Sequence, residues 1–268
     1  MGSFHSFPPT PQEKALCSVS FFPPKPSYNT CHFCTIRHRK VPYKVYRPKI
    51  PSDVYILFSH GNGLDMGQCV SVTEKFPDMT QSNVVVYDYS GYGLNPCELS
   101  PQNIIEDITA MYLMILKEMK VKPHNIFIMG HSMGVGPTLQ LGAMICESKL
   151  LKNEGVSKDD IGGVIELSGF TTCREWIQEK MKDSIFETDF FLNIENITII
   201  TAPIFVGHGQ LDNIINQNHG RKLWEHVINK ETSTCVFSDM CTHSNIFNVD
   251  EMVLQIAKFV KIHKEKSI

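Results

Sequence analysis

The chain has 268 residues, a formal net charge of −3 and 42% hydrophobic residues. This length suits one large α/β domain, and the small net charge gives no reason to expect nucleic-acid binding. No run of about twenty apolar residues is present, so we expect no transmembrane helix. Residues 1–30 carry Pro and polar residues where a signal peptide needs an apolar core, so we expect a cytoplasmic location.

Nine cysteines are scattered from Cys17 to Cys241 without the spacing of a disulfide framework. In a reducing compartment we expect free thiols, mostly buried as small hydrophobic side chains. The pair Cys31 and Cys34 has the spacing of half a zinc site, but no second pair of ligands lies nearby. We therefore expect no metal ion.

The N-terminal region is rich in Pro and basic residues, with no acidic residue between Glu13 and Asp53. We expect residues 1–28 to form an extended arm, followed by a hairpin of two strands. The first residues fit M-G-x-x-x-S, the pattern for myristoylation at Gly2. Because one myristoyl chain binds a membrane only marginally, palmitoylation of Cys17 or the basic stretch is the expected second signal. The alternatives are a chance match and a solvated basic surface.

The expected α/β domain, residues 29–268, opens with a buried strand over residues 53–59. This strand runs into a His-Gly-x-Gly sequence at residues 60–63. Such a sequence exposes backbone N–H groups at the carboxyl end of the strand, where an oxyanion hole needs a donor. We expect the amide of Asn62 to be that donor. His60 is predicted to be a packed, hydrogen-bonded side chain rather than a base.

The next expected elements are a helix over residues 66–76 and a strand over residues 83–89. Asp88 lies near the end of that strand, and we predict that it stabilises the glycine-containing turn at residues 91–93. A second helix is expected over residues 101–120, because Pro occupies its first position and an apolar stripe follows.

The sequence Gly-His-Ser-Met-Gly at residues 130–134 carries the functional prediction. It lies between an apolar run of strand length, residues 125–129, and a helix-forming stretch, residues 135–146. A serine in this context is typical of a nucleophile elbow, whose flanking glycines let the following helix pack closely. We predict Ser132 as the nucleophile and the amide of Met133 as the second oxyanion donor.

The rest of the chain alternates strands with helices. We expect strands over residues 162–168, 202–207 and 233–237, and helices over residues 216–228 and 248–264. Residues 170–200 have weaker periodicity and are either a small cap over the pocket or an ordinary pair of surface helices. This alternation predicts a mostly parallel sheet with helices on both faces.

A serine nucleophile needs a histidine base, which a carboxylate orients. In the α/β-hydrolase fold the chain order is Ser, then acid, then His. Of the downstream histidines, His243 lies in a late loop between a strand and the last helix. Asp212 follows a strand by a short turn and is the preferred acid, with Asp239 as its rival. These residues predict hydrolysis of acyl esters or thioesters through an acyl-enzyme, with no organic cofactor.

With these residues placed, the chain resembles the α/β-hydrolase superfamily and, within it, the group called α/β-hydrolase domain-containing protein 17. The resemblance spans roughly residues 20–262. It rests on short motifs: Phe22 to Tyr28, Ser59 to Asn62, Tyr87 to Gly93, the elbow, Asn193 to Glu195, His208-Gly209 with Asp212, and His243. It implies a membrane-associated serine hydrolase that removes palmitate from protein cysteines, with Ser132, Asp212 and His243 as the triad.

Two features depart from that group. Its members typically carry a cluster of N-terminal cysteines, whereas this arm contains only Cys17. The elbow reads His-Ser-Met where the group usually has Gln-Ser-Ile, which resembles general lipases and esterases. The leading hypothesis is a palmitoyl-protein thioesterase acting on acylated proteins at the cytosolic face of membranes. A lysophospholipase or monoacylglycerol-type lipase stays open, whereas a serine aminopeptidase-like hydrolase and a non-catalytic binding module are less favoured.

Overall fold

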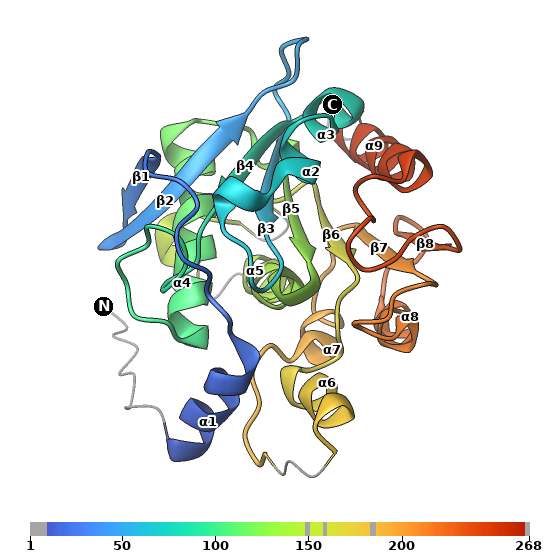
Figure 1. Cartoon of the computed structure of the whole chain (residues 1–268). Helices are drawn as coiled ribbons and strands as arrows, with labels where there is room; N and C mark the ends of the chain where they lie inside the picture. Colours follow the sequence, from blue (N-terminus) through green and yellow to red (C-terminus); the bar gives the residue numbers. More distant parts are fainter. Residues whose placement is uncertain (1–9, 148–150, 158–159, 183–185, 266–268) are drawn as a thin grey trace.

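A computed structural model describes residues 10–147, 151–157, 160–182 and 186–265, and an eight-stranded sheet forms its centre (Figure 1). The strand order is β1-β2-β4-β3-β5-β6-β7-β8. The strands are β1 (His32–Ile36), β2 (Arg39–Tyr46), β3 (Tyr55–Ser59), β4 (Asn83–Tyr87), β5 (Ile126–His131), β6 (Gly163–Leu167), β7 (Ile204–Gly209) and β8 (Thr234–Ser238). The β1–β2 and β2–β4 pairs are antiparallel, and all other pairs are parallel.

Helices cover both faces of the sheet, as the alternating pattern predicts. They are α1 (Pro11–Ser20), α2 (Val70–Thr73), α3 (Phe76–Thr80), α4 (Pro101–Leu113), α5 (Val135–Glu147), α6 (Cys173–Lys180), α7 (Asn193–Asn196), α8 (Gln217–His226) and α9 (Asp250–Glu265). Among the described residues, no helix is long and apolar enough to cross a membrane.

The hydrophobic core is divided by the sheet into two clusters. Alternate residues of β4 enter opposite clusters, because successive strand side chains point to opposite faces. Val85 belongs to the cluster that contains buried residues of α1, α4 and α5, whereas Val84 and Val86 belong to the cluster with those of α2, α3 and α9. A strand buried on both faces needs a continuous apolar run, which explains the Val-Val-Val sequence.

Two predictions about local structure are wrong. Residues 11–20 form helix α1 rather than part of an extended arm, because Thr10 and Glu13 make a capping box and Pro11 occupies the first turn. The helix expected over residues 66–76 is instead a 3₁₀ turn (Met66–Gln68) followed by α2 and the start of α3. Non-helical backbone at Cys69, with φ −79° and ψ 40°, interrupts it.

A buried ion pair ties the antiparallel edge of the sheet to α4. The Arg39 guanidinium on β2 donates to Asp107 Oδ1 at 2.8 and 3.1 Å and to Ser90 Oγ at 2.6 Å. Ser90 also donates its backbone amide to the second oxygen of Asp107, at 2.6 Å. Because the Asp107 side chain is fully buried, its charge depends on these partners.

We predict that Arg39→Met lowers the free energy of unfolding by about 3 kcal/mol, because it leaves a buried carboxylate without its counter-ion. Urea unfolding measures the change. The matched control is Arg37→Met, since the ion pairs of Arg37 with described residues are long, 3.8 and 3.9 Å to Glu106 and Glu154. The control is expected to lose less than about 1 kcal/mol. Equal losses in both variants would contradict the prediction.

Candidate active site

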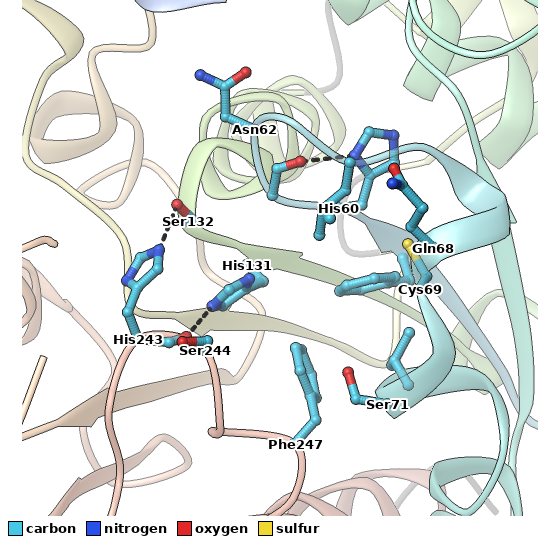
Figure 2. A pocket seen from close by; sticks show the side chains of 14 residues that line it. His60, Asn62, Gln68, Cys69, Ser71, His131, Ser132, His243, Ser244 and Phe247 are labelled. Carbon is cyan, nitrogen blue, oxygen red and sulfur yellow. Dashed lines mark hydrogen bonds between the residues drawn. The ribbon is translucent and has the colours of Figure 1, made fainter. Parts of the chain in front are cut away.

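The three residues predicted as a triad lie together at the carboxyl ends of parallel strands, and Figure 2 shows two of them, Ser132 and His243. Ser132 follows β5, Asp212 follows β7, and His243 lies in the loop after β8. Ser132 Oγ is 2.9 Å from His243 Nε2, and His243 Nδ1 is 2.7 Å from Asp212 Oδ2. Since the carboxylate can only accept, His243 Nδ1 carries a hydrogen and Nε2 is left to accept the serine hydroxyl.

Backbone geometry at the elbow requires small residues. Ser132 has a φ of +56°, in the left-handed region, and it starts the 3₁₀ turn that leads into α5. A Cβ added to Gly134 would lie 2.1 Å from the Ser59 carbonyl oxygen, and one added to Gly130 would lie 2.4 Å from the Gly134 oxygen. The glycines therefore allow the start of α5 to approach the end of β3, as the G-x-S-x-G sequence predicts.

The Asp212 carboxylate is fully buried and accepts several hydrogen bonds. Its Oδ1 accepts the amides of Ile214 and Ile215, each at 2.9 Å, and His208 Nε2 lies 3.4 Å from Oδ2. Burial alone would raise the pKa of Asp212, but the hydrogen bonds from His208 and His243 outweigh it and hold the pKa well below its usual range. The rival acid Asp239 is exposed. The hydrogen bond from His243 Nδ1 is accepted by Asp212 and not by Asp239.

His60 is fully buried, in agreement with a packing role rather than a basic one. Its Nδ1 is 2.9 Å from the Gly61 carbonyl oxygen, so Nδ1 donates. Its Nε2 lies 3.2 Å from Asp88 Oδ1. Nε2 makes no hydrogen bond among the described residues, so the ring is held by the Nδ1 bond and by packing against Tyr89 and Tyr92.

Asp88 has the structural role that the sequence predicts. Its carboxylate accepts the amide of Met66 at 2.7 Å and the hydroxyl of Tyr28. The Tyr28 oxygen in turn accepts the amide of Leu94 at 3.1 Å, directly after the turn at residues 91–93. Asp88 thus connects this turn to the loop after β3.

Asn62 lies beside the nucleophile, on the segment expected to supply an oxyanion donor. Its neighbour Gly61 faces Ser132, because a Cβ added to Gly61 would lie 3.6 Å from Ser132 Cβ. Met133, the other expected donor, directly follows the serine in the 3₁₀ turn. The orientation of the two amides toward a substrate oxygen stays a prediction.

The sequence analysis missed how the N-terminal segment holds Asn62. The Asn62 side-chain oxygen accepts from Tyr92 Oη at 2.7 Å and from the Phe22 amide at 2.9 Å. Its side-chain nitrogen donates to the Ser20 carbonyl at 2.7 Å. The end of α1 therefore holds Asn62, which lines the pocket beside Ser132. The capping sequence Thr-Pro-Gln-Glu at residues 10–13 was the signal for this helix.

A pocket of about 230 Å³ opens next to Ser132 and His243 (Figure 2). The residues around it come from the loops after β3 and β8, from α2 and from the elbow. Its apolar lining consists of Phe58, Leu64, Cys69, Val72 and Phe247.

The expected lipidation sites differ in what the structure describes. Gly2 lies outside the described residues. Cys17 lies on α1, half-buried against the hydrophobic core. Burial and, to a smaller extent, Glu13 raise the pKa of its thiol to about 11. All nine cysteines are free thiols.

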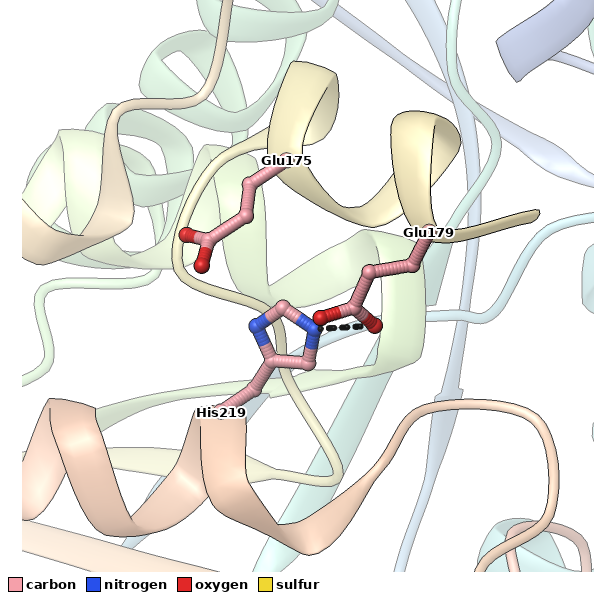
Figure 3. Close-up of side chains that lie close together, drawn as sticks. All are labelled: Glu175, Glu179 and His219. Carbon is pink, nitrogen blue, oxygen red and sulfur yellow. Dashed lines mark hydrogen bonds and ion pairs between the residues drawn. The ribbon is translucent and has the colours of Figure 1, made fainter. Parts of the chain in front are cut away.

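Glu175 and Glu179 on α6 and His219 on α8 lie close together, with ligand-type atoms within 4.8 Å of one another (Figure 3). Each has a partner inside the protein, since His219 Nε2 is 3.1 Å from Glu179 and Lys222 Nζ is 2.6 Å from Glu175. We therefore assign this cluster to linking α6 with α8. It is the one such group of three among the described residues, and Cys31 and Cys34 are not in it.

Helix α6 is also tied to the loop that carries Asp212. Trp176 Nε1 on α6 donates to the Ile214 carbonyl at 3.3 Å. The described parts of residues 170–200 contain α6 and α7, and the proposal of a small cap in this region stays a prediction.

Glu166 on β6 is a buried acid that the sequence analysis did not single out. Its Oε1 accepts the Gly169 amide at 2.6 Å, whereas Oε2 has no partner among the described residues. Burial raises the pKa of Glu166 to about 7, although His208 opposes the shift. In the folded protein the acid is therefore mainly protonated below about pH 7.

We predict that Glu166→Gln changes how stability depends on pH. A folded-state pKa above the ordinary 4.5 makes the folded state bind more protons, so wild-type stability falls as pH rises from about 4.5 to about 7. Gln cannot ionise, so the variant's Tm relative to wild type is expected to be higher at pH 8 than at pH 5. Parallel Tm profiles would contradict this, and the exposed Glu74→Gln serves as control.

The parallel sheet, the helices on both of its faces and the turn at Ser132 define the class: the chain has an α/β-hydrolase fold. Est1E of Butyrivibrio proteoclasticus, solved with bound ferulic acid, matches 86% of this chain and 99% of its own with a TM-score of 0.65 and 15% identity. A monoacylglycerol lipase of Paleococcus ferrophilus matches 83% and 99%, with a TM-score of 0.58 and 15% identity.

The resemblance to the α/β-hydrolase domain-containing protein 17 group is also confirmed. Protein 17B of Homo sapiens is 32% identical over 171 residues, 63% of this chain and 54% of its own. The aho-3 protein of Caenorhabditis elegans is 30% identical over 197 residues, 71% of this chain and 53% of its own. These stretches are shorter than the expected span, and the chain covers about half the length of these relatives. No protein-family model matches the chain.

Proposed function

We propose that the protein is a serine hydrolase that cleaves acyl esters or thioesters. The observation that carries the proposal is the continuous hydrogen-bonded series from Ser132 through His243 to Asp212 at the mouth of a largely apolar pocket. A serine hydroxyl becomes nucleophilic when an adjacent base accepts its proton.

In the proposed mechanism, Ser132 Oγ attacks the acyl carbonyl while its proton passes to His243 Nε2. Asp212, whose lowered pKa keeps it ionised, stabilises the resulting imidazolium through Nδ1. The amides of Asn62 and Met133 hold the negative oxygen of the tetrahedral intermediate. His243 then gives its proton to the leaving thiol or alcohol, and the acyl group stays on Ser132.

In the second half of the reaction, water attacks the acyl-enzyme with His243 as base. The carbon–oxygen bond to Ser132 breaks, and the proton returns to the serine. The products of this half are a carboxylic acid and the free serine. No atom changes its oxidation state, so the cycle needs no oxidant or reductant.

The pocket supports a hydrocarbon chain as the acyl group. A cavity of about 150 Å³ holds a six-carbon benzene ring. The pocket of about 230 Å³ therefore accommodates part of a fatty acyl chain next to Ser132, and the remaining carbons of a palmitoyl chain would lie outside it. The resemblance to the protein 17 group supports palmitoylated proteins as the finer substrate class. The His-Ser-Met elbow supports the second candidate, a monoacylglycerol-type lipase or lysophospholipase.

We predict that a fluorophosphonate probe labels the wild-type protein and does not label Ser132→Ala. Hydrolysis of acyl substrates should fall by at least about 1,000-fold in the variant, because the nucleophile is lost. Palmitoyl-thioester and monoacylglycerol substrates are assayed in parallel. Turnover of the thioester alone would favour depalmitoylation, and turnover of the glycerolipid alone would favour the lipase. A folded wild type without labelling would sink the proposal.

We further propose peripheral binding to the cytosolic face of membranes through myristoylation of Gly2, if translation starts at Met1. The M-G-x-x-x-S sequence supports this site, and Cys17 is the weaker candidate because it is half-buried with a raised pKa.

Gly2→Ala should move the protein from the membrane to the soluble fraction of expressing cells. Removing the acyl chain removes its hydrophobic contribution to membrane binding. Cys17→Ser is the matched comparison. An unchanged distribution of Gly2→Ala would show that Gly2 is not the anchor.

A further inference from the structure

The elbow contains a second histidine that contacts the loop of the proposed base. His131 is the last residue of β5, directly before Ser132, and its side chain is 8% exposed. Its Nε2 lies 2.9 Å from the backbone carbonyl oxygen of His243. Figure 2 shows the His131 ring between His243 and the apolar part of the pocket.

This contact defines the chemical state of His131. A carbonyl oxygen only accepts, so Nε2 carries a hydrogen and donates it. Burial, followed by the neighbouring His243, lowers the pKa of His131 to about 3, while the bond to the His243 carbonyl and Asp212 oppose the shift. His208 is a further group that lowers it. His131 is therefore a neutral donor at physiological pH, and it adds no positive charge beside the imidazolium that forms on His243.

Packing holds the ring in this position. The ring centroids of His131 and His243 are 4.9 Å apart. The Phe247 ring contacts the His131 ring edge-on, with centroids 5.3 Å apart and an angle of 70° between the planes. Both neighbours belong to the segment between β8 and α9. Strand β5 therefore contacts this segment through one hydrogen bond and two ring contacts, all made by His131.

The segment that carries His243 has few regular backbone bonds of its own. The Cys241 carbonyl accepts the Leu211 amide at 3.1 Å, and Asn245 Oδ1 accepts the Thr242 amide at 2.7 Å. Besides the ring contacts, the bond from His131 connects β5 to the backbone of this segment. It acts on the backbone of His243 itself, so it limits how far the imidazole can move away from Ser132.

We propose that His131 is a positioning residue, which holds His243 at bonding distance from Ser132 by donating a hydrogen bond to the His243 carbonyl. This inference rests on the proposed function. An error of about 1 Å in the placement of a catalytic group lowers the rate by up to about 100-fold, so loss of one donor at this position has a measurable effect.

The test compares two substitutions of one residue. His131→Phe keeps a ring against His243 and Phe247 but has no donor, whereas His131→Gln keeps an N–H group near the position of Nε2. We expect His131→Phe to lower kcat and the rate of fluorophosphonate labelling by about tenfold or more, with KM within about twofold. We expect His131→Gln to stay within about threefold of wild type. Thermal unfolding checks that both variants fold, and His131→Met replaces His131→Phe if the latter does not.

A second readout does not depend on activity. The hydrogen that His243 Nδ1 shares with Asp212 gives a downfield proton NMR signal, assigned by its loss in Asp212→Ala. This signal should broaden or vanish in His131→Phe and persist in His131→Gln. Equal behaviour of the two variants, in labelling or in the NMR signal, would overturn the inference. If the wild type itself is not labelled, the proposed function fails, and the NMR comparison still decides the role of His131.

Discussion

The close approach of the start of α5 to the end of β3 is the contact on which the site depends. Gly134 lies against the Ser59 carbonyl, where a Cβ would be only 2.1 Å from the oxygen. This approach brings the loop after β3 next to Ser132, so Gly61 faces the serine and Asn62 follows Gly61 in the chain. A larger residue at Gly134 would separate the two segments and displace nucleophile and loop together.

Parallel pairing of β5, β6, β7 and β8 supplies the second condition. Their carboxyl ends meet at one edge, so the residues after β5, β7 and β8 become neighbours although up to 111 positions separate them. The strands alone do not determine the distances within the site. Short loops with few regular bonds carry Asp212 and His243, and side-chain contacts from His208 and His131 hold them.

Two buried acids show how local donors decide charge. Asp212 accepts two backbone amides and a bond from His243, and its pKa is lowered. Glu166, on the neighbouring strand β6, accepts one amide, its other oxygen has no partner in the described part of the chain, and burial raises its pKa. Burial favours the neutral form of both acids, so the number of donors determines which one stays ionised. The ionised acid is the one bonded to His243.

The sequence by itself determined the class of fold and the three residues of the candidate triad. Strand-length apolar runs, the G-x-S-x-G spacing and the order Ser, Asp, His are local or sequential properties. Helix α1 could also have been predicted from its capping sequence. The interruption of the expected helix at Cys69 could not. Only the tertiary structure decided that the end of α1 bonds Asn62 and that His131 bonds the loop of His243. It also decided that Glu166 is buried with one oxygen unpaired among the described residues. These contacts join residues far apart in the chain, and their distances depend on packing that no local pattern encodes.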